Sequence, residues 1–316
     1  MLFSPVNSQS AMHIPDGFLS VTVSVVFWVI SIVVIGIALK KANKQISEKD
    51  VPLMGILAAA IFAGQMLNFS VSGGTSGHLL GAAIATILLG PWQAVLVMTT
   101  VVSVQALVFQ DGGLIVLGAN LFNMAIVGVF VANTIYSLLK NVLAKKTWGI
   151  LAAGFIAAWT SIFIASLSCA IQLALSGTSP ANIAIPAMAI IHAIIGIGEG
   201  LITIGALGFI LASRKELITK LGAEKQGGKG LLVVGGLIAL LLAVLSPLAS
   251  SHPDGLEWVA EQHGFLEVAR DSFYNTIPDY TMPGISSPAL ATIIAGIIGV
   301  LLVFVVAFGV ARAERK

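Results

Sequence analysis

Long apolar runs dominate this sequence and restrict it to a polytopic membrane protein. A helix needs about 20 consecutive apolar residues to cross the hydrocarbon core of a bilayer. Of the 316 residues, 57% are hydrophobic and only 9% are charged, whereas soluble domains carry about 25% charged residues. We therefore predict an all-α fold with about nine transmembrane helices, at residues 19–40, 52–70, 77–90, 92–110, 118–139, 149–175, 184–212, 230–249 and 289–311.

The distribution of basic residues predicts the orientation of these spans. With nine spans, 15 of the 16 Lys and Arg residues fall on one side of the membrane, and Arg270 is the exception. The positive-inside rule makes that side cytoplasmic. The N-terminal segment, the loops around 71–78 and 111–117, and the segment 250–288 should then face outward.

The chain divides into two predicted membrane units. Residues 12–213 contain seven spans and should form a seven-helix bundle, while residues 230–316 contain two spans joined by the outer loop 250–288. Residues 214–229 are charged and contain glycine, as expected of a cytoplasmic linker. Gly90 and Pro91 alone separate the third and fourth spans, and both residue types can break a helix.

Two histidines are placed to meet at the outer face. His13 precedes the first span, and His78 opens the third span after the glycine-rich stretch VSGGTSG. Imidazole is the commonest protein ligand for transition metals, and a site needs two or more ligands that converge. The alternative interpretation is a capped helix start with a hydrogen-bonded histidine.

A methionine directly before His13 adds a second possibility for metal binding. If Met12 were the first residue, its amine, the amide of His13 and the His13 imidazole would form one fused chelate. The imidazole of His78 would then complete a plane of four nitrogens. Such a plane suits Ni(II) or Cu(II), whereas zinc prefers a tetrahedron.

Several long motifs carry a resemblance to a known family. MHIPDGFLS, GTSGHLLGAAIATILLGPW, VQALVFQDGGLIVLGANLFNM and HAIIGIGEGLIT occur in that order. They resemble the substrate-capturing membrane subunit of nickel/cobalt energy-coupling factor transporters, the CbiM/NikM type. The C-terminal segment, with SHPDGLEWVAEQHGF and IPDYTMPG, resembles the two-span NikN/CbiN-like component, here fused to the same chain.

The resemblance implies a function, partners and site residues. It implies uptake of Ni2+ or Co2+ as transported substrate across a bacterial or archaeal plasma membrane, with no permanently bound cofactor. The partners would be a coupling transmembrane subunit and cytosolic ATPases. Carried over by motif, the metal ligands are Met12, His13 and His78. The MHIPDG start resembles the nickel branch more closely, and nitrogen ligands favour Ni(II) over Co(II).

The leader MLFSPVNSQSA departs from this pattern, because an attached residue removes the free amine of Met12. It has neither a basic region nor an apolar region, so it is a poor signal peptide. We expect residues 1–11 to reflect a misassigned start, with Met12 as the true initiator. Processing after Ala11 is the alternative.

Other polar residues are candidates for supporting roles. Gln105, Asp111 and Asn120 flank the same outer loop as His78. They could orient the metal ligands by hydrogen bonds without touching the metal, or could cap that loop. His192 and Glu199 lie seven residues apart in the seventh span. An acid within a membrane span is costly and by default marks a function, but the two could also form a buried structural pair.

Two other functions remain open from sequence alone. No GxxxxGK[ST] element is present, so ATP hydrolysis would have to come from a partner, and nothing suggests a nucleic-acid partner. One alternative is a stand-alone ion-coupled metal permease with Glu199 as its ion carrier. The other is an intramembrane metal-dependent enzyme using His192 and Glu199, although the sequence has no HExxH helix.

Overall fold

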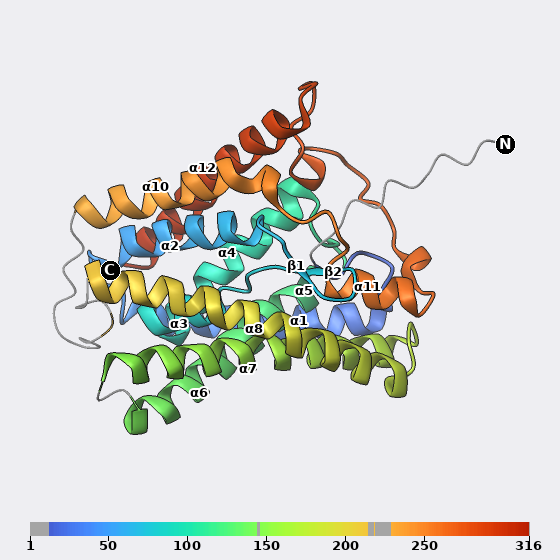
Figure 1. Ribbon diagram of the computed structural model, residues 1–316, viewed down its shortest axis with the longest axis horizontal. Helices are drawn as coiled ribbons and strands as arrows, with labels where there is room; N and C mark the ends of the chain where they lie inside the picture. The colour runs from blue at the N-terminus through green and yellow to red at the C-terminus, as the bar shows by residue number, and fades with distance from the viewer. Residues whose placement is uncertain (1–12, 144–145, 214–217, 219–228, 316) are drawn as a thin grey trace.

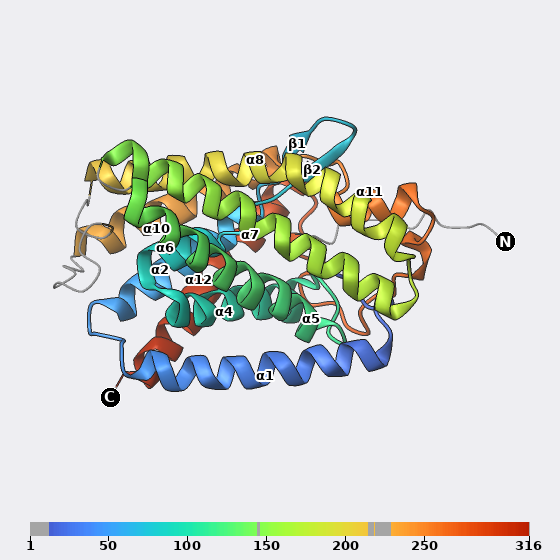
Figure 2. The same ribbon diagram turned by 90° about the horizontal axis from the view of Figure 1, so that it is seen from below.

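The chain folds into a bundle of long helices that lie side by side (Figures 1 and 2). This computed structural model describes residues 13–143, 146–213, 218 and 229–315. The predicted leader 1–11, Met12 and most of the predicted linker 214–229 lie outside the described residues.

Helices account for most of the described chain. The long ones are α1 (Val21–Asn43), α2 (Asp50–Gln65), α4 (Pro91–Phe109), α6 (Gly128–Leu143), α7 (Thr147–Ser176), α8 (Ala181–Ser213), α10 (Lys229–Leu245) and α12 (Pro288–Glu314). The short ones are α3 (Ala82–Leu89), α5 (Leu117–Leu121), the π-helical η1 (Phe122–Val127), α11 (Gly255–Gln262) and the 3-10 turns η2 (Ser246–Leu248), η3 (Leu266–Val268) and η4 (Pro278–Tyr280). Strands β1 (Phe69–Val71) and β2 (Thr75–Gly77) form an antiparallel hairpin.

The helices confirm the prediction of an all-α polytopic membrane protein. Among the described residues, six helices are long and apolar enough to cross a membrane, including the continuous rod Leu117–Leu143 formed by α5, η1 and α6. Two shorter apolar helices, Asp50–Gln65 and Leu232–Leu248, account for two further predicted runs. The exposed valines of α1, such as Val25 and Val29, suit contact with lipid.

The third predicted span differs from a simple helix. Only eight residues, Ala82–Leu89, are helical there, which gives a length of about 12 Å. The residues before α3 run in a non-helical conformation from the hairpin to Gly81, whose φ is +81°. This part of the chain therefore traverses the bundle as an extended segment followed by a short helix. Apolar composition alone does not distinguish that arrangement from a single helix.

The two ends of the bundle carry different chemistry. At one end, the Lys41 ammonium lies 4.9 Å from the centre of the Trp92 ring at the start of α4. Glu48, in the loop before α2, pairs with Arg315 after α12. The basic segments that follow α1 and α12 therefore meet at this end. The hairpin, the loop after α4, and α11 lie toward the other end (Figure 1).

The two C-terminal spans pack against the first unit through α2. Helices α10 and α12 both contact α2, and almost every residue of α2 is buried. Glycines bring the backbones close together: a Cβ at Gly55 would lie 3.0 Å from the Phe304 ring, and one at Gly235 would lie 2.7 Å from Ile56. Substitution at either glycine would therefore push α2 away from the C-terminal helices.

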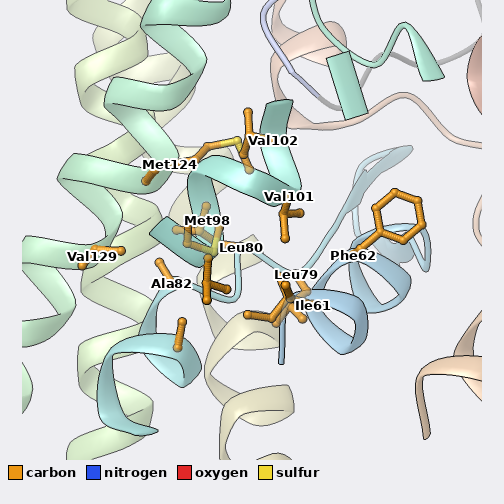
Figure 3. Close-up of a cluster of buried hydrophobic side chains, with 14 of the residues drawn as sticks. Ile61, Phe62, Leu79, Leu80, Ala82, Met98, Val101, Val102, Met124 and Val129 are labelled. Atoms are coloured by element: carbon orange, nitrogen blue, oxygen red, sulfur yellow. The ribbon is translucent and has the colours of Figure 1, made fainter. Parts of the chain in front are cut away.

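A buried apolar cluster surrounds the segment that leads into α3. Figure 3 shows Leu79 and Leu80 within a cluster that includes Ile61 of α2 and Met98 of α4. Leu79 is 5% exposed and Leu80 is 3% exposed. The extended segment is thus anchored by its own side chains, although it lacks helical hydrogen bonds.

Candidate metal site

The N-terminal segment is fixed by the loop that follows α4. The Asn120 side chain accepts a hydrogen bond from the Ile14 amide at 3.0 Å and donates to the Ile14 carbonyl at 3.1 Å. The Gly113 amide also donates to the Ile14 carbonyl, at 2.9 Å. Both backbone groups of the residue after His13 are therefore held in place.

Asp16 connects the same two segments. Its carboxylate accepts hydrogen bonds from the amides of Leu114, Ile115 and Val116, at 2.9 to 3.2 Å. These amides precede α5, where a carboxylate is favourable because helical N–H groups at that end lack partners. The Pro-Asp-Gly triplet at 15–17 thus caps the loop against which the chain start folds.

His78 enters the site from the hairpin. The turn between β1 and β2 contains Gly73 and Gly74, both with positive φ, and His78 follows β2 directly. The Nδ1 atom of His78 lies 3.0 Å from the Leu79 carbonyl. This contact favours a proton on Nδ1, which would leave Nε2 as the nitrogen with a lone pair for a ligand.

The structure brings His13 and His78 together. Their ring centres lie 5.8 Å apart, and the ring planes are inclined by 63°. The Nδ1 atom of His13 lies 2.9 Å from Oδ1 of Asp111. Its Nε2 is buried and has no hydrogen-bond partner among the described residues. The polar contact that orients the His13 ring is therefore the one through Nδ1.

Glycine is needed where the loop after α4 meets His13. Gly112 has a φ of +89°, and a Cβ there would lie 2.8 Å from the Cβ of His13 and 2.9 Å from the Asn120 amide nitrogen. A side chain at this position would therefore displace both the histidine and the residue that holds its neighbour.

A tyrosine from the C-terminal unit completes this arrangement. The hydroxyl of Tyr280, in η4, donates to Oδ2 of Asp111 at 2.5 Å. Tyr280 also stacks on Phe109 at the end of α4, with ring centres 4.8 Å apart. One oxygen of the Asp111 carboxylate therefore contacts His13, and the other accepts from Tyr280, which lies 169 positions later in the sequence.

Charge couples His13 to Asp111. Burial alone lowers the pKa of His13, but the charge and hydrogen bond of Asp111 outweigh it, so the pKa lies above its ordinary value of 6.5. Burial likewise raises the pKa of Asp111, and the interactions with His13 and Tyr280 reverse that effect, so its pKa is lowered. The pair therefore favours an imidazolium beside a carboxylate, and a metal ion must displace that proton.

A cavity of about 90 Å³ lies beside the two histidines. Its lining includes His13, His78, Asn120, His192 and Asp254. Asp254 is 3% exposed, and burial raises its pKa to about 7. The cavity therefore combines nitrogen donors with a carboxyl group that would gain from a nearby cation.

Residues of the C-terminal unit cover one side of the cavity. Ser76 of the hairpin donates through its amide to the Pro253 carbonyl at 2.8 Å and through its hydroxyl to the His252 carbonyl at 2.9 Å. Asp254 caps α11 by accepting from the Glu257 amide at 2.7 Å. A Cβ at Gly255 would lie 2.9 Å from the His192 ring, so glycine permits the close approach to α8.

The remaining predicted residues have different partners. Gln105 is fully buried in α4, where it donates to Gln65 at 2.8 Å and shares a side-chain hydrogen bond with Tyr280. His192 faces the cavity, and its Nδ1 lies 3.0 Å from the Met188 carbonyl. Glu199 bonds instead to the backbone before α3. The hydrogen bonds of His192 and Glu199 thus go to different partners.

Sequence reasoning assigned no role to two residues at the site. Tyr280 lies in the IPDYTMPG motif, and Asp254 lies in the SHPDGLEWVAEQHGF motif, both within the predicted loop 250–288. In the second motif His252 and His263 are exposed, whereas Asp254 and Glu257 are buried. The recurrence of Pro-Asp-Gly at 253–255 was the signal, because both triplets place a capping aspartate and a closely packed glycine.

Side chains alone do not complete a metal site. Within the described residues, no group of three or more His, Cys, Asp or Glu side chains is spaced to hold a metal ion. Two imidazoles therefore need further donors to complete a metal site. A separate cavity of about 590 Å³ between α2, α8 and α10 has a mainly aliphatic lining and offers no comparable ligands.

Comparison with known proteins assigns the family. Residues 13–217 match the CbiM model, a cobalt uptake substrate-specific transmembrane region, and residues 229–316 match the PDGLE domain. The chain belongs to the CbiM family. It carries a PDGLE domain on the same polypeptide, as the C-terminal motifs suggested.

Similar proteins share this fused organisation. A chain of Archaeoglobus fulgidus with the name "Putative fused nickel transport protein NikMN" is 38% identical over 96% of this chain and 99% of its own length. The fused nickel transport protein NikMN of Rhodobacter capsulatus is 28% identical, covering 92% and 95%. A solved transition metal transporter is 36% identical, with a TM-score of 0.58, covering 65% of this chain and 95% of that one. This CbiM-family protein is therefore a multi-pass metal transport protein of the nickel/cobalt class.

Proposed function

We propose that this protein captures Ni(II) or Co(II) at the outer face of the plasma membrane as the substrate-binding subunit of an energy-coupling factor transporter. One observation carries the proposal: His13, which is buried, and His78, which is half-buried, lie 65 positions apart in sequence but converge with their ring centres 5.8 Å apart. Their convergence supplies two nitrogen ligands for one metal ion.

The proposed ligands are four nitrogens from three residues. They are the amine of Met12, the amide and imidazole of His13, and the imidazole of His78. Only Nδ1 of an imidazole can close a six-membered chelate ring with the amide of its own residue. Because Nδ1 of His13 lies 2.9 Å from Asp111 Oδ1, metal binding must replace that contact. Deprotonation of the amide makes binding dependent on pH.

Charge distribution supports the proposed sidedness. The C-terminal ends of α1 and α12, which carry Lys41 and Arg315, lie at the end of the bundle remote from the hairpin (Figure 2). If basic segments face the cytoplasm, the site with His13 and His78 faces outward. Asp254 and Tyr280, from the segment between α10 and α12, then cover an external site, and the ion must pass this cover to enter.

Relatives support the choice of metal. Three fused relatives are named for nickel transport, whereas a relative of Geobacter sulfurreducens, 28% identical over 84% of this chain, is named as a cobalt transport protein, CbiM. A plane of nitrogens also suits Ni(II). We therefore propose nickel as the preferred substrate, with cobalt also accepted.

ATP hydrolysis is proposed to occur on partner proteins. The sequence has no phosphate-binding GxxxxGK[ST] loop, so a coupling membrane subunit and cytosolic ATPases would supply the energy. Co-purification of the chain with an ATPase, and uptake that stops without ATP, would separate this function from that of a stand-alone ion-coupled permease.

The Met12 amine provides the sharpest test of the ligand set. Protein beginning at Met12 should bind Ni(II) tightly in calorimetry, and acetylation of that amine should weaken binding by about 100-fold or more, because the acetylated nitrogen cannot close a chelate ring with the His13 amide. The same treatment of the form that carries the 11-residue leader, whose Met12 has no amine to block, is the control. Equal affinity of the form with its 11-residue leader, confirmed intact by mass spectrometry, would refute the amine as a ligand.

A further inference from the structure

The backbone groups of the segment between His78 and α3 need hydrogen-bond partners inside the membrane. Its backbone is not helical, and Leu79 and Leu80 are almost fully buried. Backbone N–H and C=O groups at membrane depth have no water and must find partners within the protein. Whatever satisfies these groups also fixes the path of the chain just after His78.

Glu199 of α8 accepts hydrogen bonds from two of these backbone amides. Its Oε2 accepts a hydrogen bond from the Leu80 amide at 2.7 Å, and its Oε1 accepts one from the Gly81 amide at 3.1 Å. The side chain is completely buried. A carboxylate is suited to this task because each of its two oxygens is an acceptor, and bonds from N–H groups to a charged oxygen are stronger than neutral ones.

The carbonyl group of Leu80, the residue whose amide bonds to Glu199, is held by α2. The Gln65 side chain donates to the Leu80 carbonyl at 2.9 Å, and Gln105 donates to Gln65 at 2.8 Å. Leu80 is thus clamped through both of its backbone groups. Because His78 lies two residues earlier in the same extended segment, this clamp restricts where its imidazole can lie.

We propose that Glu199 is a positioning residue for the metal site: by holding the Leu80 and Gly81 amides, it places the His78 imidazole opposite His13. This inference rests on the proposed metal-binding function and gives the intramembrane acid a role that does not require it to carry an ion. Glu199 acts through the backbone and does not touch the metal.

The isosteric substitution Glu199→Gln tests the role directly. Glutamine keeps the shape but has a single acceptor oxygen and an NH2 group, which would face a backbone N–H. The clamp loses one bond, and His78 loses its fixed position. We expect the affinity for Ni(II), measured by calorimetry on the full chain, to fall by about 10- to 100-fold, as for other residues that orient metal ligands.

Thr203→Val provides a matched control. Thr203 lies one helical turn beyond Glu199 in α8 and is also completely buried, and the substitution is nearly isosteric. It should leave Ni(II) affinity unchanged. A second variant, Gln65→Met, releases the Leu80 carbonyl from the other side and should cause a smaller loss of affinity. That result does not depend on whether Glu199→Gln accumulates in the membrane.

A double-mutant cycle distinguishes positioning from a general structural role. If Glu199 acts through His78, then Glu199→Gln should cause no further loss of Ni(II) affinity in a His78→Ala background. The ligand-field absorption of bound Ni(II) should also lose its planar signature in Glu199→Gln. Equal losses in both backgrounds, or unchanged affinity in Glu199→Gln, would overturn the inference. Absence of Ni(II) and Co(II) binding by the unmodified protein would instead overturn the proposed function.

Discussion

The two histidines of the site are held in different ways. The ring of His13 is oriented by side chains at the mouth of the bundle, because Asp111 lies 2.9 Å from its Nδ1 and Tyr280 supports that carboxylate. The ring of His78 contacts the carbonyl of its own neighbour, and its position depends on backbone bonds to Glu199 deeper in the bundle. His13 should therefore be sensitive to local charge, and His78 to the path of the chain.

Loss of either imidazole should have the largest effect. His13→Ala and His78→Ala should each lower Ni(II) affinity by more than about 100-fold, beyond the range typical of residues that only orient ligands. Calorimetry on purified protein measures this loss. His252→Ala and His263→Ala are matched controls, since both histidines are exposed. Similar losses in the controls would place the metal on the outer loop instead.

Loss of the carboxylate behind His13 should have a smaller effect. Because the chelate uses the nitrogen that Asp111 contacts, Nδ1 of His13, Asp111→Asn should leave Ni(II) affinity at high pH within about tenfold of that of the unmodified protein. Its main effect should be a change in the pH dependence of Ni(II) affinity. Asp111 holds the pKa of His13 above 6.5, so a proton competes with the metal as the pH falls through that raised value.

Asparagine removes the charge responsible for this shift. The pKa of His13 then falls, and the loss of affinity on acidification should begin at a lower pH in Asp111→Asn than in the unmodified protein. Calorimetry across a pH series measures this difference. Identical pH dependence of Ni(II) affinity in the two proteins would show that Asp111 does not control protonation of His13. The claim that His13 is more sensitive to local charge than His78 would then be wrong.

Loss of a single hydroxyl should have the smallest effect. Tyr280→Phe keeps the ring stacked on Phe109 but removes the hydrogen bond to Asp111, so Ni(II) affinity should fall by no more than about tenfold. Tyr274→Phe is the control, because the Tyr274 hydroxyl donates to backbone carbonyls of α4. A loss in Tyr274→Phe equal to that in Tyr280→Phe would attribute the effect to packing of the C-terminal unit.

The sequence predicted those parts of the structure that depend on the pattern of apolar residues along the chain. Apolar runs of membrane length predicted the long helices, because no other element satisfies the backbone in lipid. The spacing of these runs placed His13 and His78 at one end, where the structure has them. The third run was less informative, since an extended segment and a helix with the same apolar residues look alike.

Contacts across long sequence distances could not be read from the pattern. Asp111 and Tyr280 are 169 positions apart, and the partners of Glu199 are backbone amides, which every residue carries. Their identification requires the folded chain. The same holds for Asp254, whose burial results from the close approach of Gly255 to α8.

Anomalous scattering at the nickel absorption edge would test the central claim most directly. Crystals of the protein grown with Ni(II) should show one strong peak between the rings of His13 and His78, within about 2.1 Å of a nitrogen of each. A peak beside His252 or His263, or between His192 and Asp254, with none between His13 and His78, would contradict the account.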